Sequence, residues 1–262
     1  MDPVTHITSG ALGGRLAEAK TGRRSIFWFC VAAAWLPDID NVAGLLGPEQ
    51  YLLYHRGITH SVFGGLALAF VFSCIFKLLI RKFPFVAGFL IAYGLILIHI
   101  FLDLVTSYGT QILSPLSMKR YTVTSIFIID PIFTLVMVGC FLSTRFWKEN
   151  ANKIAVAGLG WVFLYPLLCF GVRKGLTDYY SRHLHVGEEG TVYQKIELST
   201  EPFSPFRWKM LAEDEEHYYL AGVNVFRPDT EPSFEAYPKP PLALVEPLER
   251  RISMLKTYLW FA

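Results

Sequence analysis

Three apolar runs constrain the fold of this chain more than any other feature of its sequence. Residues 61–80, 85–106 and 154–172 consist mainly of aliphatic and aromatic side chains, and each is close to the roughly 20 residues that a helix needs to cross a bilayer. The apolar residues are clustered in these runs and lack the spacing of an amphipathic helix. The sequence therefore predicts a multi-pass helical membrane protein.

The composition agrees with that class. Of the 262 residues, 53% are hydrophobic and only 18% are charged, which is too apolar for an ordinary soluble domain. The net charge of +2, without a long run of Lys or Arg, excludes the electrostatic footprint of a nucleic-acid-binding protein. The four cysteines lie inside apolar segments without C-x-x-C spacing, so we expect them to be buried hydrophobic residues.

Two shorter apolar segments precede the long runs. They are residues 4–19 and 25–36, joined by a basic turn at 20–24. Pro37 ends the second segment, because proline disfavours helix at the preceding residue. Both are too short for a full span, so they predict an antiparallel hairpin. Such a hairpin brings His6, near the start of the first helix, close to Asp38 and Asp40 after the second.

The expected fold is mainly α: a polytopic helical membrane bundle with a small C-terminal α+β domain. The bundle comprises the short hairpin and about four spanning helices, the additional span lying at 124–144 with Asp130 and Pro131 in its first turns. We expect a membrane-embedded domain at 1–175 and an extramembrane domain at 176–262. In the latter, the sequence predicts strands at 191–198 and 218–226, a turn at 203–210 leading into a third strand, and an amphipathic helix at 246–261.

Basic residues are distributed unequally between the two ends of the predicted bundle. The end that carries the inter-helix turns has eight, and the other end, with the C-terminal domain, has five. The eight are Lys20, Arg23, Arg24, Arg81, Lys82, Arg145, Lys148 and Lys153, and the five are Arg56, Lys119, Arg120, Arg173 and Lys174. The positive-inside rule therefore predicts that the end with five basic residues and the C-terminal domain are on the non-cytoplasmic face.

Candidate metal ligands gather at the end with fewer basic residues. The segment from Pro37 to His60 contains two aspartates and two histidines between strongly apolar segments. His99 and Asp103 are four positions apart, so on a helix they project from the same face. The alternative is that Asp103 only orients a polar His99 inside the bundle, but ionisable groups at membrane depth tend to be functional.

The segment after Pro37 is expected to be extended, so Asp38 and Asp40 should point to opposite sides. One would then be a ligand, and the other would support a ligand or bind a second metal. Arg56 is a candidate for binding an anionic group such as phosphate, with a lipid headgroup contact as the alternative.

The predicted site combines imidazole and carboxylate groups. The expected metal ligands are His6, Asp38, Asp40, His55, His60, His99 and Asp103, and the expected catalytic residues are Asp38, Arg56 and Asp103. This set suits one or two divalent ions, with zinc favoured and manganese or iron as alternatives.

Three motifs carry a family resemblance over roughly residues 1–135. They are Leu36-Pro37-Asp38-Ile39-Asp40, His55-Arg56-Gly57-Ile58-Thr59-His60-Ser61, and His99 with Asp103 followed by Thr106, Gly109 and Pro115, together with His6 near the N-terminus. With them the chain resembles the inner-membrane metal-dependent hydrolases typified by YdjM, a domain of otherwise unknown function. That family often has histidine after the second aspartate of the first motif, where this sequence has Asn41. The His-x-x-x-Asp pair is also similar to that of helical zinc phospholipase C and nuclease enzymes, which is analogy alone.

The resemblance and the ligand set together predict a membrane-bound, metal-dependent hydrolase. Its expected substrate is a phosphoester of a membrane lipid or a lipid-linked small molecule, and no nucleic-acid partner is expected. Two alternatives remain open. One is a metal or ion transporter, although transport sites usually lie at the bilayer midplane. The other is a non-enzymatic membrane scaffold with a structural polar cluster.

Overall fold

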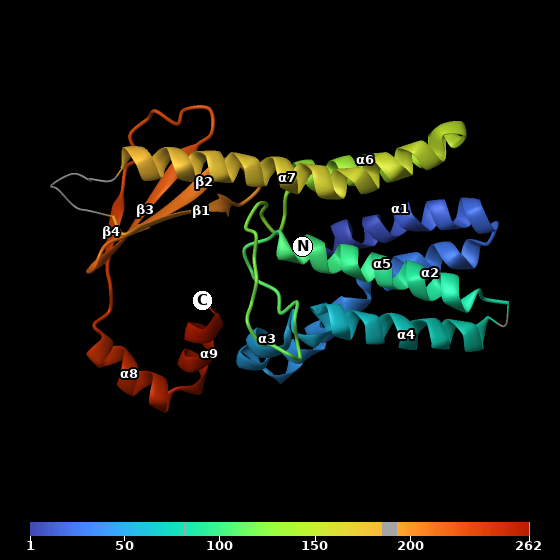
Figure 1. The fold of residues 1–262 in the computed structure, drawn as a ribbon, viewed down its shortest axis with the longest axis horizontal. Coiled ribbons are helices and arrows are strands. Elements are labelled where there is room, and N and C mark those ends of the chain that lie inside the picture. The colour runs from blue at the N-terminus through green and yellow to red at the C-terminus, as the bar shows by residue number, and fades with distance from the viewer. Residues whose placement is uncertain (81, 185–192, 262) are drawn as a thin grey trace.

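The computed structural model describes residues 1–80, 82–184 and 193–261, and in them a helical bundle is joined to a small sheet domain (Figure 1). The long helices of the bundle are α1 (Pro3–Thr21), α2 (Arg24–Trp35), α4 (Val62–Leu79), α5 (Phe85–Leu104), α6 (Pro131–Phe146) and α7 (Ala151–His183). Shorter elements are η1 (Leu36–Leu46), α3 (Pro48–Tyr54), η2 (Ile58–His60) and η3 (Lys148–Asn150). Arg81 of the predicted basic turn lies outside the described residues.

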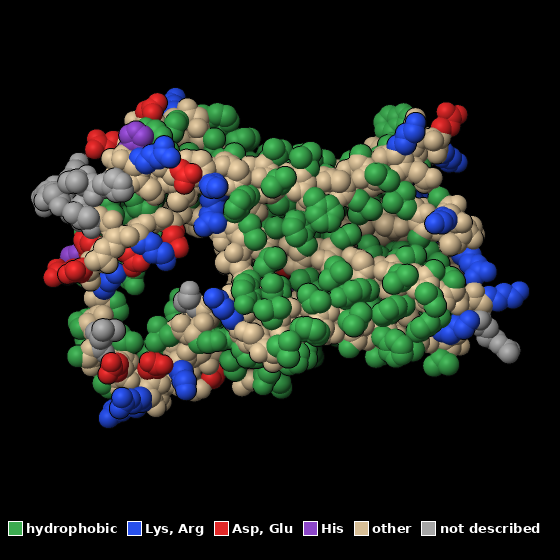
Figure 2. Space-filling model, in the orientation of Figure 1, with side chains coloured by type: hydrophobic (Ala, Val, Ile, Leu, Met, Phe, Trp, Pro, Cys, Tyr) green, Lys and Arg blue, Asp and Glu red, His purple; other side chains and the backbone are tan. Residues whose placement is uncertain are grey.

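Four helical stretches in the described residues are long and apolar enough to cross a membrane. They are Arg24–Leu46, Val62–Leu79, Phe85–Leu104 and Lys148–His183, whereas Pro131–Phe146 is a shorter apolar helix. This set differs from the expected one, because α2 continues directly into η1 and the helix expected at 124–144 begins only at Pro131. Hydrophobic side chains cover most of the visible bundle surface in Figure 2, whereas charged side chains gather at its ends and on the C-terminal domain. The predicted fold class, a helical membrane bundle with a small α+β domain, is confirmed.

The predicted N-terminal hairpin is formed by α1 and α2, which pack closely because small residues line their interface. A Cβ atom added at Gly10 would lie 2.6 Å from Ala34 Cβ and 2.8 Å from the carbonyl oxygen of Cys30. Glycine is thus required where the two backbones approach. This close contact places the first turns of α1 beside the end of α2, at the end of the bundle that holds the predicted ligands (Figure 1).

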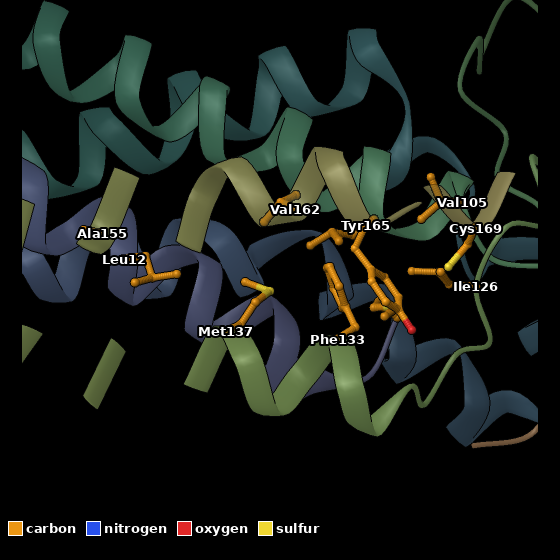
Figure 3. Close-up of a cluster of buried hydrophobic side chains, with 11 residues drawn as sticks. Leu12, Val105, Ile126, Phe133, Met137, Ala155, Val162, Tyr165 and Cys169 are labelled. Atoms are coloured by element: carbon orange, nitrogen blue, oxygen red, sulfur yellow. The ribbon is translucent and has the colours of Figure 1, made fainter. Parts of the chain in front are cut away.

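A hydrophobic core joins α1 to α6 and α7 (Figure 3). Leu12 of α1 packs with Met137 and Phe133 of α6 and with Val162 of α7, all fully buried. At roughly 25 cal/mol per Å² of apolar surface, burying one such side chain contributes about 1.5–3 kcal/mol in water. In a bilayer, helix association depends more on close packing.

The predicted helix at 124–144 begins later than expected. Residues 124–130 are not helical, and Thr124 has a φ of 49°, outside the helical range. Asp130 caps α6 by accepting a hydrogen bond from the Phe133 backbone N–H at 3.0 Å. Pro131 is the first helical residue, where its missing N–H is not needed. The prediction was wrong over 124–130, because Asp130 and Pro131 start the helix instead of interrupting it.

The C-terminal sheet is antiparallel, with strand order β1-β2-β3-β4. Its strands are β1 (Lys195–Glu201), β2 (Ser204–Glu213), β3 (His217–Asn224) and β4 (Glu235–Pro238). Buried Trp208 and Met210 of β2 pack against Leu176 and Tyr180 of α7. The helix therefore continues past the predicted domain boundary at 175, and its last turns belong to the sheet's core.

Several predicted boundaries in this domain differ from the structure. Residues 191 and 192 of the first predicted strand lie outside the described residues. The expected turn at 203–210 is mostly strand β2, and β4 was not predicted. The single predicted helix at 246–261 is two helices, α8 (Leu242–Arg251) and α9 (Ser253–Phe261).

Helix α9 returns to the bundle and lies against α3 (Figure 1). The hydroxyls of Ser253 and Thr257 both donate to the Glu49 carboxylate of α3, the latter at 3.0 Å. The Arg120 guanidinium lies over the rings of Trp260 and Phe261, 5.3 Å and 4.8 Å from their centroids. The C-terminal domain thus contacts the bundle both through α7 and through α9.

Candidate metal centre

His99 and Asp103 lie in the last two turns of α5 and face the same side, as their spacing predicts. His99 Nε2 is 3.3 Å from Asp103 Oδ2. The other ring nitrogen, Nδ1, donates a hydrogen bond to the carbonyl oxygen of Ala34 at 2.7 Å. In the neutral ring this bond leaves the lone pair on Nε2. Both side chains are fully buried, so this lone pair is directed into the protein.

His60 faces this pair from η2, immediately before α4. Its Nε2 lies 3.1 Å from His99 Nε2 and 3.1 Å from Asp103 Oδ2. Its Nδ1 lies 3.0 Å from Asp40 Oδ2. Two histidine nitrogens and one carboxylate oxygen therefore converge on one point, while a second carboxylate holds the far side of His60.

Asp38 completes the group from η1. Its Oδ1 is 3.5 Å from Nε2 of both His60 and His99. The expected extended segment after Pro37 is wrong, because residues 36–46 form a 3₁₀ helix. Side chains two positions apart on such a helix differ by about 120° in direction instead of 180°. Asp38 and Asp40 therefore both reach the cluster, from different sides of His60.

These four side chains fit a divalent metal ion. One donor atom from each of Asp38, His60, His99 and Asp103 lies within 4.8 Å of the other three. The five separations given above span 3.1–3.5 Å. Metal bonds of about 2.0–2.1 Å in a tetrahedron give donor separations of about 3.4 Å. Asp103 Oδ2 is also buried and makes no well-oriented hydrogen bond among the described residues, as expected of a ligand atom.

Asp40 and His55 lie behind His60 and are not members of the four-residue group. Asp40 Oδ1 is 2.8 Å from His55 Nδ1, and its Oδ2 accepts hydrogen bonds from the Thr59 hydroxyl at 2.6 Å and the Arg56 backbone N–H at 3.0 Å. A carboxylate bound to the remote nitrogen of a ligating histidine fixes the tautomer and orientation of its ring. Asp40 has this position relative to His60.

His6 reaches the centre from α1, as the hairpin predicts. Its ring stacks on that of His99 with centroids 3.6 Å apart, and its Nε2 is 3.4 Å from Asp103 Oδ1. Both of its ring nitrogens are buried without a hydrogen-bond partner among the described residues. His6 therefore contacts two of the four donor residues, His99 and Asp103, but is not one of the four.

Arg56 lies against the far oxygen of Asp103. Its Nη2 is 2.9 Å from Asp103 Oδ1, which the Met1 amino group also contacts. Its Nη1 donates to the Thr106 hydroxyl at 2.8 Å, and its guanidinium stacks on the Tyr108 ring at 4.8 Å. Arg56 is 4% exposed and has a φ of 57°, a conformation that costs a non-glycine residue energy and that recurs at functional sites.

The electrostatics favour a charged His60 before any metal binds. Burial alone would lower the pKa of His60, but the neighbouring carboxylates of Asp103, Asp38 and Asp40 outweigh it and raise the pKa to about 10. A metal at Nε2 would have to displace a proton.

Asn41, which replaces the family's frequent histidine, is directed away from the four donors. It is exposed, and its side-chain amide donates to the Asp38 carbonyl oxygen at 2.8 Å. Tyr51 in turn donates its hydroxyl to Asn41 at 3.2 Å. Asn41 closes the first turns of η1, and the donor group is assembled without it.

Some supporting groups were not predicted. Thr59 holds Asp40, Tyr108 lies over Arg56, and the Ala34 carbonyl sets the His99 tautomer. A backbone carbonyl carries no sequence signal, whereas Thr59 lies within the second motif and could have been found there.

The fold and this donor set define a multi-pass helical membrane protein with a candidate metal centre at one end of its bundle. The family described as YdjM inner membrane protein matches residues 1–176, more than half of the chain. The protein belongs to this family, which confirms the resemblance seen in the motifs. It is also similar to the uncharacterized protein YfhP of Bacillus subtilis (strain 168), with 25% identity over 232 residues, covering 85% of this chain and 68% of that protein. No solved structure matches the chain.

Proposed function

We propose that this protein is a metal-dependent hydrolase acting at the membrane surface on a phosphoester of a lipid or lipid-linked molecule. The observation that carries the proposal is the convergence of two imidazoles and two carboxylates within 4.8 Å, in a buried setting. These are ligand types for zinc, manganese and iron, with zinc favoured. A single compact group of four donors supports one ion, with His6, Asp40 and His55 around it.

The position of the centre favours hydrolysis over transport. His60 comes just before α4, and Asp103 is one residue from the end of α5. The donors therefore collect at the ends of helices, whereas transport sites usually lie near the bilayer midplane. We also propose that this end is non-cytoplasmic, since it carries five of the basic residues compared above and the opposite end carries eight.

An apolar cavity beside the centre supports a lipid substrate. It has a volume of about 370 Å³, and Asp40 lies in its wall together with Val42, Leu45, Leu46 and Tyr54. Leu45 and Leu46 are 85% and 74% exposed, so in a bilayer this segment would contact lipid chains. None of the four donor residues lies in this wall, so a substrate with its apolar part here would extend past Asp40 and His60 to bring its polar group to the donors.

The residues have distinct roles in this proposal. A bound divalent ion would supply Lewis acidity toward water and the phosphoryl group. Asp38, whose side chain is 10% exposed, is the donor most accessible to solvent and is placed to receive a proton from water. Arg56 offsets negative charge at Asp103, and its buried Nε, which has no partner among the described residues, remains to donate to a phosphoryl oxygen.

Metal quantification joined to a substrate panel tests the proposal. The purified full-length protein should contain about one equivalent of metal, and His60→Ala and Asp103→Ala should lose most of it. His183→Ala, an exposed histidine of α7, is the matched control and should retain metal. The panel compares a soluble phosphomonoester, a phosphodiester phospholipid and a lipid pyrophosphate in mixed micelles. Substoichiometric metal that is unchanged in both site variants would refute the metal centre.

A further inference from the structure

Arg15 of α1 lies at the end of the bundle opposite the metal centre, and its guanidinium contacts two aromatic rings. Its guanidinium lies 5.3 Å from the Phe27 ring centroid of α2 and 5.6 Å from that of Phe141 of α6. Its only ion pair among the described residues is a long one, 3.5 Å to Glu18. Its Nε is buried without a hydrogen-bond partner in that part of the chain. Aromatic contacts therefore position a charge that protein groups only partly satisfy.

Two cavities meet at this side chain. One, of about 650 Å³, extends toward the α6–α7 turn and includes Arg145 and Lys148 in its wall. The other, of about 400 Å³, extends toward α2 and includes Arg24 and Trp28. Arg15, Glu18 and Arg145 belong to both walls, so the cavities adjoin.

The walls carry a net positive charge that the described residues do not neutralise. Four cations (Arg15, Arg24, Arg145 and Lys148) face one carboxylate, that of Glu18. Arg24, Arg145 and Lys148 form no ion pair with any residue that the structure describes. Figure 2 shows blue side chains predominating at this end of the bundle. Like charges held together repel each other, and an anion with several oxygens would relieve that repulsion.

Aromatic side chains line the smaller cavity beside the cations. Trp28, 57% exposed, lies in the smaller cavity beside Phe27 and Phe141. Trp side chains favour the headgroup level of a bilayer, and basic pockets between membrane helices bind lipid phosphates. A free phosphate would use the cations alone, whereas a phospholipid would also use this apolar wall.

We propose that these cavities form a binding site for an anionic phospholipid. Its phosphate lies between Arg15 and Arg145, and its acyl chains run along Phe27 and Trp28 toward the membrane. Arg15 is nine residues from His6 on the same helix, about 14 Å along the axis at 1.5 Å per residue. The lipid site is therefore separate from the metal centre, and it stands whether or not that centre hydrolyses a substrate.

Native mass spectrometry of the full-length protein in detergent tests the proposal. Wild-type protein should retain phosphatidylglycerol in preference to phosphatidylcholine of the same chain length. Arg145→Gln/Lys148→Gln removes two exposed cations of the pocket and should weaken phosphatidylglycerol binding by about thirtyfold, at about fivefold per cation. Lys20→Gln/Lys153→Gln removes the same charge from the same end outside both cavities and should leave binding unchanged.

Two further measurements distinguish a bound phospholipid from free phosphate. Trp28→Ala retains all four cations and should reduce lipid retention, since it removes the apolar wall. Millimolar inorganic phosphate should fail to displace the lipid. Equal loss in the Lys20/Lys153 control would assign the effect to the general surface charge and overturn the proposal. Displacement by inorganic phosphate, with Trp28→Ala unaffected, would also overturn it by identifying a site for free phosphate.

Discussion

Asp40 contacts the Nδ1 side of His60, 3.0 Å away, while Nε2 of the same ring faces the donor atoms of Asp38, His99 and Asp103. The two aspartates of one short motif thus have different positions. Asp38 supplies one of the four donor atoms. Asp40 instead contacts the ring of His60, which supplies another.

This difference predicts graded losses of metal affinity. Asp40→Asn keeps the shape of the side chain but removes the charge that orients His60, so affinity should fall about 10–100-fold. Asp38→Asn should cost more, because it changes a donor atom. Competition with a coloured chelator measures both. Asn41→Ala, which alters an exposed neighbour, should match wild type. Equal affinity of Asp40→Asn and wild type would contradict the supporting role.

Metal binding should also depend on pH through His60. The pKa of this histidine is raised to about 10, so the metal-free ring is charged near pH 7. Metal affinity should therefore rise as the pH increases toward 10, with proton release on binding. Titration calorimetry in buffers of different ionisation enthalpy counts the protons. A heat of binding that is independent of the buffer would contradict this prediction.

The same pKa predicts the opposite trend for stability without metal. A raised pKa means that the charged ring stabilises the fold fully below the unfolded value of about 6.5. That contribution is lost as the pH rises from about 6.5 through 10. Thermal unfolding of chelator-treated protein across this range measures it, and His60→Gln should flatten the profile.

Gly10 should be intolerant of a methyl group. Its added Cβ would lie 2.6 Å from that of Ala34, so Gly10→Ala must separate α1 from α2 or distort them. Overpacking of this kind costs about 1–3 kcal/mol. Gly139→Ala in α6 is the control, since nothing lies within 4 Å of its added Cβ. In detergent, the midpoint of thermal unfolding should fall for Gly10→Ala and stay unchanged for Gly139→Ala.

The buried bond between Tyr165 and Asp130 should stabilise the start of α6. Tyr165 donates its hydroxyl to Asp130 Oδ2 at 2.7 Å, while Oδ1 caps the helix. Tyr165→Phe should lower the free energy of unfolding by about 1–3 kcal/mol, because the buried Asp130 carboxylate loses one hydrogen-bond donor. Tyr93→Phe, which removes a long 3.4 Å bond, should cost less than about 0.5 kcal/mol. Similar losses in the two variants would contradict this view of Asp130.

Much of the bundle could be predicted, because bilayer length and apolar runs leave few alternatives. The hairpin argument placed His6 at the centre for a physical reason: antiparallel helices bring their outer ends together. The i,i+4 rule placed His99 beside Asp103. Whether each of the seven predicted ligands binds metal stays a prediction, although the structure brings all seven to one end of the bundle.

Other features depended on local detail that the sequence does not display plainly. Residues after Pro37 were expected to be extended, yet a 3₁₀ helix forms, and that geometry decides where Asp38 and Asp40 point. Asp130 and Pro131 resembled a break within a helix and are its start. In the C-terminal domain, the strand predicted at 218–226 corresponds to β3, but β1 extends past the first predicted strand and most of β2 was expected to be a turn. Short alternating segments are weaker signals than long apolar runs.

The attachment of the C-terminal domain has a consequence for access. Helix α7 carries the sheet away from one side of the bundle, and α9 fastens the following chain to α3 on another side (Figure 1). The domain is therefore connected to the bundle at two places, and it lies beyond the same end of the bundle as the four donors (Figure 1). Under the proposed function, a lipid substrate would arrive from the bilayer beside the exposed leucines of η1, whereas a large water-soluble molecule would first meet the C-terminal domain.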